Sequence, residues 1–245
     1  MFKYLLNFLI LILIISCSQE DDLNDIKSSS LIKPNFLSKE VRYDCIFNKD
    51  ASLNRLEAFI PNFVNRINKN IKAPNIEFLF NQQEIVKSFT ILYSAIEENF
   101  NADLVSNLLI EEGINKIANC NFNNNESMLS ARLKLNDQDL DLKSFEVEIL
   151  KCRFNDGFNY GTFAIEVDTF FNIVRKKNID YFARFLQKND SNSAFVWMNY
   201  IGSAEDKVVL YKDWLYDEDS SAIQNAFNIQ AKCESSMAYK GYKVL

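Results

Sequence analysis

Cys45-Ile46-Phe47-Asn48 and Cys152-Arg153-Phe154-Asn155 share the pattern Cys-x-Phe-Asn, and the two copies lie 107 positions apart. The similarity continues downstream, because the apolar positions of the helical pattern after the first copy fall on apolar or aromatic residues when 107 is added to their numbers. The pairs are Leu53 and Tyr160, Leu56 and Phe163, Ile60 and Val167, Phe63 and Phe170, Val64 and Phe171, and Ile67 and Val174. The sequence therefore predicts a tandem duplication.

Both halves of the chain predict the same order of elements: strand, helix, strand, strand, helical region and strand. The expected elements are 40–47, 51–70, 75–81, 88–95, 102–119 and 127–135 in the first half, and 145–153, 160–177, 179–187, 194–201, 204–232 and 235–244 in the second. Residues 75–78 align with 178–181 in this scheme. The expected organisation is a repeat at 40–136, a linker at 137–144 and a repeat at 145–245.

The βαββαβ order resembles the ferredoxin-like unit, in which an antiparallel sheet carries both helices on one face. Segments such as 182–186 and 195–198 place apolar residues on both sides of the strand, so both faces of each sheet are expected to be buried. Two units packed sheet against sheet are similar to the dimeric α/β-barrel superfamily, fused into one chain. The resemblance implies an α+β fold and covers residues 40–245, but no residue matches a catalytic motif of that superfamily.

Four cysteines follow Cys17, two in each predicted repeat and at corresponding places. The end of the first strand and the end of the second helix lie at the same edge of a βαββαβ unit, so the expected disulfides are Cys45–Cys120 and Cys152–Cys233. Buried free thiols or a four-cysteine metal site are the alternatives, and the lack of Cys-x-x-Cys spacing argues against the metal site.

The N-terminal segment has the pattern of a signal peptide, with a short basic start and a mainly apolar run from Leu5 to Ile15. A helix of this length rises only about 16 Å, roughly half the hydrocarbon thickness of a bilayer. Ile14-Ile15-Ser16-Cys17 resembles the lipobox of bacterial lipoproteins. This resemblance implies cleavage of residues 1–16 and attachment of lipid to Cys17. An ordinary secretory signal with an incidental cysteine is the alternative.

Residues 17–39 are polar and mixed in charge, and we expect a flexible tether there. The expected location is the outer membrane, facing the periplasm, or the outer face of the plasma membrane in a cell with a single membrane. The membrane is then a partner through the lipid anchor. A formal net charge of -6 argues against nucleic acid as a partner.

The chain contains no histidine, which excludes Ser-His-Asp hydrolysis, Cys-His catalysis and zinc or haem held by histidine. Asp137-x-Asp139-x-Asp141 with Glu148 copies part of a calcium loop, but Leu142 stands where that loop needs glycine. We therefore expect no metal and no cofactor. An enzyme of this composition would use carboxylates, Tyr, Lys or Ser, and no catalytic residue is assigned.

A candidate pocket is indicated by polar or amphipathic side chains in otherwise apolar strands of the second half: Arg184, Trp197, Asn199 and Tyr200. The alternative is that Trp197 fills the core while Arg184 and Asn199 point outwards or satisfy one another.

Three functions are consistent with these observations. The first is a non-enzymatic lipoprotein that binds a small apolar ligand or an envelope protein, which the anchor and the lack of a catalytic constellation favour. The second is a cofactor-independent oxygenase or isomerase, as some members of the dimeric α/β-barrel superfamily are. The third is a structural subunit of an outer-membrane assembly.

Overall fold

The computed structural model describes residues 34–82, 87–123, 126–135, 140–189, 191, 193–216, 218–234 and 236–245. The first half of the fold contains β1 (Ser38–Phe47), α3 (Leu53–Asn70), β2 (Asn75–Asn81), β3 (Ser88–Ala95), a 3₁₀ turn (Glu97–Asn99), α4 (Ala102–Glu111), a second 3₁₀ turn (Ile114–Lys116), β4 (Ala118–Cys120) and β5 (Met128–Lys134). The second half contains β6 (Ser144–Phe154), α5 (Tyr160–Arg175), β7 (Tyr181–Gln187), β8 (Ala194–Ile201), α6 (Ala204–Tyr216), α7 (Glu218–Gln230), β9 (Ala231–Cys233) and β10 (Met237–Lys243).

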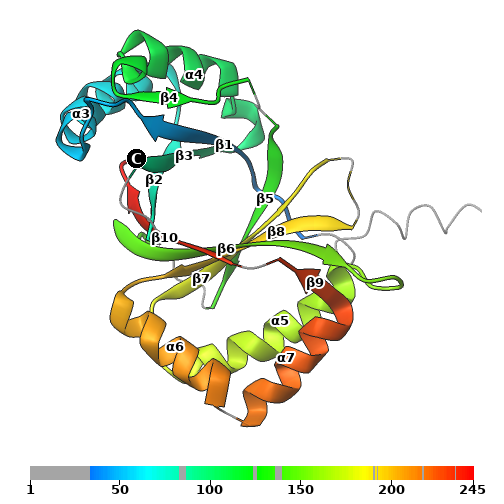
Figure 1. Cartoon of the computed structure of the whole chain (residues 1–245). Helices are drawn as coiled ribbons and strands as arrows, with labels where there is room; N and C mark the ends of the chain where they lie inside the picture. The colour runs from blue at the N-terminus through cyan, green and yellow to red at the C-terminus, as the bar shows by residue number, and fades with distance from the viewer. Residues whose placement is uncertain are drawn as a thin grey trace, which may run out of the picture.

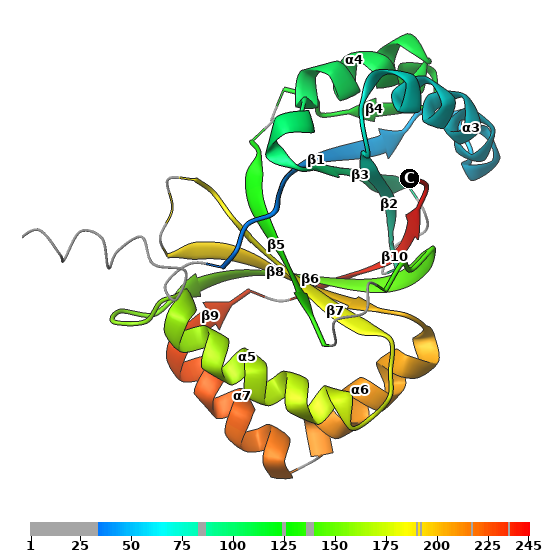
Figure 2. The same ribbon diagram turned by 180° about the vertical axis from the view of Figure 1, so that it is seen from behind.

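Eight antiparallel strands form a closed barrel. The first half contributes the order β2-β3-β1-β5 and the second half the order β7-β8-β6-β10. The last strand of each half pairs with the second strand of the other, β5 with β7 and β10 with β2, and these two pairings close the barrel. Helices α3 and α4 cover one side of the barrel, and α5, α6 and α7 cover the opposite side (Figures 1 and 2).

Alternation along the strands divides the molecule into three apolar layers. On β1, Val41, Tyr43 and Cys45 face the helices of the first half, so the intervening residues face the barrel interior. The second half has a matching layer between its helices and its strands, centred on residues such as Phe163. The barrel interior forms the third layer, which includes Phe145. Because both faces of the sheet are covered, the strands carry apolar residues on both sides, as the sequence predicts.

Two predicted helical regions are interrupted in the structure. Region 102–119 contains α4, a 3₁₀ turn and the start of the short strand β4, and region 204–232 contains α6, α7 and the start of the short strand β9. Gly113 ends α4 with a φ of 94°, a left-handed conformation that favours glycine and turns the chain out of the helix. None of the helices in the described residues is long and apolar enough to cross a membrane.

The short strands explain the repeated Cys-x-Phe-Asn pattern. β4 pairs with β1 and β9 pairs with β6, so Cys45 lies opposite Cys120 and Cys152 lies opposite Cys233. Both predicted disulfides are present, with Cα–Cα distances of 4.0 Å. The asparagine of each copy then ties the strand end to the segment before the second cysteine. Asn48 donates to the carbonyl of Asn115 at 3.0 Å, and Asn155 donates to the carbonyl of Ile229 at 2.8 Å.

Candidate functional site

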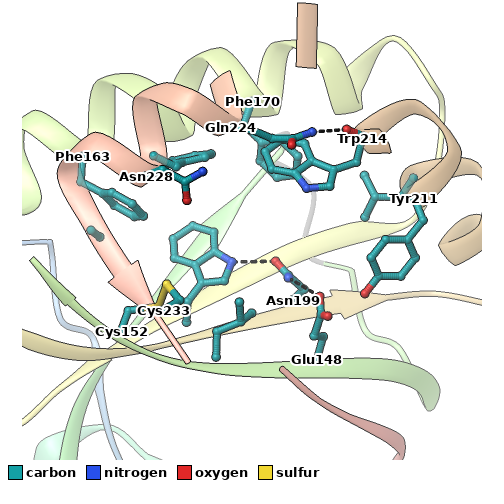
Figure 3. A pocket seen from close by; sticks show the side chains of 15 residues that line it. Glu148, Cys152, Phe163, Phe170, Asn199, Tyr211, Trp214, Gln224, Asn228 and Cys233 are labelled. Atoms are coloured by element: carbon teal, nitrogen blue, oxygen red, sulfur yellow. Dashed lines mark hydrogen bonds between the residues drawn. A yellow bond between two sulfur atoms is a disulfide. The ribbon is translucent and has the colours of Figure 1, made fainter. Parts of the chain in front are cut away.

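A cavity of about 350 Å³ lies between the strands and the helices of the second half (Figure 3). Its volume falls within the ordinary range of small-molecule pockets. Its walls are mainly apolar and aromatic, and its polar groups come from β6, β8, α6 and α7. The lining residues are Glu148, Leu150, Cys152, Phe163, Phe170, Trp197, Asn199, Leu210, Tyr211, Trp214, Gln224, Phe227, Asn228, Ala231 and Cys233. We call this cavity the second-half pocket.

The first half fills the corresponding space with two tyrosines. The registers of β1 with β3 and of β6 with β8 make Tyr43 correspond to Leu150, and Tyr93 to Asn199. Tyr43 and Tyr93 are completely buried. The Tyr43 hydroxyl donates to the carbonyl of Ala102 at 2.8 Å, and the Tyr93 ring stacks on Phe100 at 5.1 Å between ring centroids. Leu150 and Asn199 are smaller than tyrosine, which leaves space for a pocket in the second half.

A hydrogen-bonded carboxylate lies on the strand side of this pocket. Asn199 Nδ2 donates to Glu148 Oε2 at 3.1 Å. The amide oxygen of Asn199 accepts from Trp197 Nε1 at 2.6 Å and from the Tyr181 hydroxyl at 2.7 Å. Two donors on the oxygen fix the orientation of the amide, so its nitrogen is directed at Glu148. The labelled side chains of Asn199 and Glu148 meet in this way at the pocket floor (Figure 3).

Tyr211 approaches the same carboxylate from helix α6 (Figure 3). Burial is the main cause that raises the pKa of Tyr211, and the charge of Glu148 and a hydrogen bond to Glu148 raise it further. The Tyr211 hydroxyl therefore stays protonated near neutral pH and can donate a hydrogen bond. Glu148 and Tyr211 together give the pocket a carboxylate acceptor and a neutral hydroxyl donor.

The barrel interior contains a separate buried ionic cluster. Arg184 Nη1 lies 3.1 Å from Glu40 Oε2, and the other amino group of Arg184 pairs with Glu77. The Tyr200 hydroxyl donates to Glu77 Oε2 at 2.8 Å. Burial raises the pKa of Glu40 to about 7, and this effect outweighs the opposing effect of the Arg184 guanidinium. The pairing leaves the guanidinium of Arg184 with carboxylate partners inside an otherwise apolar layer.

The four residues singled out from the sequence are divided between these two places. Trp197 and Asn199 line the second-half pocket on the helix side of β8. Arg184 and Tyr200 lie on the barrel side, within the buried ionic cluster. They do not form one pocket, because residues 197 and 199 alternate with residue 200 across the faces of the same strand.

Sequence reasoning missed Glu148 and Tyr211 as site residues. Glu148 follows the alternation of Phe145, Val147 and Ile149, so from sequence it belongs to a strand face that looks solvent-exposed. Helices α6 and α7 cover that face in the structure. A signal was available, however, because subtracting 107 places the buried apolar residue Val41 at the position of Glu148.

No cluster of potential metal ligands is found in the part of the chain that the structure describes. Asp137 and Asp139 of the calcium-like pattern lie outside the described residues. Asp141 pairs instead with Lys143 at 2.7 Å and with Lys243 at 2.6 Å. Glu148, the last residue of that pattern, lies in the second-half pocket.

Comparison with solved structures shows the dimeric α/β-barrel fold. A candidate monooxygenase from Fusobacterium nucleatum subsp. nucleatum ATCC 25586 is 10% identical, covers 86% of this chain and 94% of its own, and has a TM-score of 0.56. A candidate monooxygenase from Lactobacillus acidophilus NCFM is 10% identical, covers 84% and 95%, and has a TM-score of 0.54. A candidate chlorite dismutase is 9% identical, covers 85% and 96%, and has a TM-score of 0.55. No protein-family model and no curated protein matches the sequence.

The leading functional prediction from the sequence, a non-enzymatic lipoprotein that binds a ligand or a protein, was wrong. The three structures of similar fold are all named for enzymes, two monooxygenases and a dismutase. The prediction rested on the expected lipid anchor and tether and on the lack of a recognisable catalytic motif. That lack has little weight when the structures of similar fold are only 9–10% identical to this chain. The second hypothesis, an oxygenase or isomerase, agrees better with these comparisons.

The residues of the second-half pocket do not fit a haem group. The chain has no histidine, and the pocket's two cysteines are joined in a disulfide. The described lining of the pocket contains no methionine, and its tyrosine is hydrogen-bonded to Glu148. None of the usual axial ligands of a haem iron is therefore free in this pocket.

Proposed function

We propose that the protein is a cofactor-independent oxygenase that acts on a small aromatic compound with an acidic C–H bond. The observation that carries the proposal is the Glu148 carboxylate, held by Asn199 at the floor of an aromatic cavity. The names of the two monooxygenase-like structures of similar fold support it. The aromatic walls, among them Trp214 and Phe170, suit a planar substrate.

Glu148 is the general base in this proposal. It removes a proton from the substrate carbon. Once Glu148 is protonated it is a weaker acceptor, so the Tyr211 hydroxyl turns from Glu148 to donate its hydrogen bond to the negative charge that develops on a conjugated oxygen. The electron pair left on the substrate then reduces dioxygen. For a CH₂ group the balance is R₂CH₂ + O₂ → R₂C=O + H₂O, so one oxygen atom stays in the product and the other leaves as water. Asn199 positions the carboxylate through its fixed amide.

Anthrone is a suitable probe, since it is a planar tricyclic ketone with an acidic CH₂ group. We expect the wild-type protein to exchange the CH₂ protons of anthrone with D₂O without oxygen, and to consume one O₂ per anthraquinone formed in air. Glu148→Gln should lower both rates by about 10²–10³-fold, which is the usual contribution of a general base. Glu205→Gln on the exposed start of α6 is the matched control and should leave both rates unchanged.

Two results would overturn this assignment. Equal proton exchange by the wild-type protein and the Glu148→Gln variant would remove the role of Glu148. Exchange without any oxygen uptake would identify the activity as that of an isomerase, in which the proton returns to the substrate. Both measurements should use protein dialysed against EDTA, so that contaminating metal ions do not produce the oxidation.

We also propose that Cys17 carries the lipid anchor and that the enzyme lies in the outer membrane, facing the periplasm. The lipobox-like segment 14–17 and the two disulfides, which are typical of oxidising compartments, support this location. Residues 1–33 lie outside the described part of the chain. Labelling with radioactive palmitate should be lost in Cys17→Ala but retained in Ser18→Ala. Retention of the label in Cys17→Ala would contradict the anchor.

The matching element orders of the two halves support our proposal that the barrel arose by tandem duplication of a ferredoxin-like unit. The boundaries proposed for it are a repeat at 40–136, a linker at 137–144 and a repeat at 145–245. A chain of residues 137–245 that forms a dimer of the same fold would support this origin, and an unfolded chain would argue against it.

A further inference from the structure

One end of the barrel opens into a second cavity of about 880 Å³. It lies where β1, β6 and β7 end and where β5 and β8 begin. Four of its apolar side chains come from four different strands and also belong to the barrel core: Leu92, Ile149, Leu186 and Met198. These four side chains are almost completely buried, so the cavity ends against the apolar core of the barrel, where the partly buried Met128 and Val196 form its floor. It is on the opposite face of the sheet from the second-half pocket.

Three cations stand on one side of this opening. Lys151 and Arg153 continue the interior face of β6 beyond Ile149, because side chains two residues apart share a strand face. Lys232 of β9 lies opposite Arg153 in the strand register and so shares that face. The disulfide Cys152–Cys233 joins the same two strands on the other face and fixes their pairing. These three residues are the cationic rim.

The charges of the cationic rim are not neutralised within the described residues. Lys151, Arg153 and Lys232 are exposed, and none of them forms an ion pair with a described residue. The neighbouring acids of the opening are mostly engaged, since Asp44 pairs with Arg42 at 2.8 Å and Glu126 pairs with Lys188. Glu234 is the remaining carboxylate. The opening thus offers an excess of positive charge beside an apolar floor.

The floor of the cavity, unlike the cationic rim, does not suit a negatively charged group. Glu40 lines it, and Arg184 behind Glu40 is already paired with Glu40 and Glu77. A negative group placed there would lie beside two carboxylates in a buried region. A ligand with one charged end would therefore enter with its apolar part first and leave its charge at the rim.

We propose that this end of the barrel is a second binding site, separate from the second-half pocket, for an amphipathic anion with a single hydrocarbon chain. The chain lies on the apolar floor formed by Met128 and Val196 over the barrel core, and the carboxylate or phosphate head is held by Lys151, Arg153 and Lys232. The proposal does not depend on the function assigned to the second-half pocket.

Dodecanoate, below its micelle concentration, is the probe for this site, and isothermal titration calorimetry on the full chain is the measurement. We expect dodecanoate to bind, and dodecyltrimethylammonium to bind at least about tenfold more weakly, because like charges repel at the rim. The triple variant Lys151→Gln, Arg153→Gln and Lys232→Gln should lower the affinity for dodecanoate about tenfold, which is the combined contribution of three exposed charge contacts. The matched control, Lys69→Gln, Lys72→Gln and Lys212→Gln, removes the same charge elsewhere and should bind like the wild type.

A third variant separates this site from the second-half pocket. Leu150→Tyr places a ring in that pocket and should leave dodecanoate binding unchanged. Any one of three results would overturn the proposal: no binding of dodecanoate, an unchanged affinity in the rim variant, or loss of binding in Leu150→Tyr. Dodecyl phosphate in place of dodecanoate distinguishes the two head groups, and tighter binding of either one identifies the natural class.

Discussion

The two halves of the barrel share one strand arrangement but differ at corresponding positions. On the helix-facing side, the first half has Val41, Tyr43 and Tyr93 where the second half has Glu148, Leu150 and Asn199. The first set fills its space and is completely buried, whereas the second set leaves a cavity with a carboxylate at its floor. The same strand arrangement therefore encloses a solid core in the first half and a pocket in the second, and the side chains at corresponding positions make the difference.

The barrel interior shows a second kind of difference. Glu77 and Arg184 occupy corresponding places, since Glu77 lies opposite Leu92 on β3 and Arg184 lies opposite Met198 on β8. These two residues pair with each other across the barrel. This pair of opposite charges links the two halves. In a barrel made of two identical halves, the same positions would carry like charges, which would repel each other.

The largest effect is expected from exchanging the filling residues. Tyr43→Leu removes a completely buried ring and leaves the carbonyl of Ala102 without its hydroxyl donor. We expect it to lower the free energy of unfolding by about 4 kcal/mol, the combined cost of the cavity left by a buried ring and of the lost hydroxyl hydrogen bond. Leu150→Tyr in the second half should change the stability by less than about 1 kcal/mol, because its ring enters an existing cavity.

Urea unfolding with intact disulfides measures both variants, and the oxygenase assay gives a second readout. Leu150→Tyr should abolish activity by filling the pocket, while Tyr43→Leu should retain activity at temperatures where it is folded. Similar losses of stability in the two variants would mean that the second half is packed as tightly as the first. The contrast between a filled half and a hollow half would then be incorrect.

The sequence predicts the barrel well because its signals are repeated. Apolar alternation, the helical period and the two Cys-x-Phe-Asn segments each occur in both halves, and the disulfides follow from their positions. The alignment of residues 75–78 with 178–181 was wrong, since the strand registers match residue 75 with residue 182. The connection from α5 to β7 is longer than that from α3 to β2. The dipeptide Asn-Ile occurs at 75–76 and at 178–179, and this local match made the two segments look aligned.

The site could not be predicted in the same way. Whether a polar residue on a strand faces water or a covered pocket depends on helices that lie far away in the sequence, as for Glu148 under α6 and α7. Arg184 and Tyr200 looked like pocket residues because they interrupt apolar strands, but they satisfy Glu40 and Glu77 inside the barrel. Only the three-dimensional pairing separates a structural polar group from a functional one.

A smaller effect is expected from Glu40, which corresponds to the apolar Val147 in the second half. Burial raises the pKa of Glu40 from 4.5 to about 7, although Arg184 opposes this change. The folded state then holds the proton more tightly than the unfolded state. The contribution of protonated Glu40 to stability is present below about pH 4.5. As the pH rises to about 7 this contribution is lost, which lowers the free energy of unfolding by up to about 3 kcal/mol.

Urea unfolding of the wild type and Glu40→Gln between pH 4.5 and 7.5 tests this linkage. The stability of the wild type relative to the variant should fall across this range, because the amide that replaces the carboxyl group in the variant does not titrate. Glu205→Gln, which removes an exposed carboxylate on α6, should show no such trend. A rise in the stability of the wild type relative to Glu40→Gln over this range would mean that pairing with Arg184 outweighs the effect of burial on the pKa of Glu40.

The smallest effect concerns the first helix of each half, where the halves differ in their N-terminal caps. Asn159 accepts from the backbone nitrogens of Gly161 at 2.9 Å and Thr162 at 3.3 Å, whereas Ser52 makes no side-chain capping bond. Asn159→Ala should therefore lower the free energy of unfolding by about 1 kcal/mol, and Ser52→Ala by only a few tenths. Urea midpoints at one pH compare the two. Equal losses would show that both helices are capped alike in solution, so the halves would differ only in their filled and hollow cores.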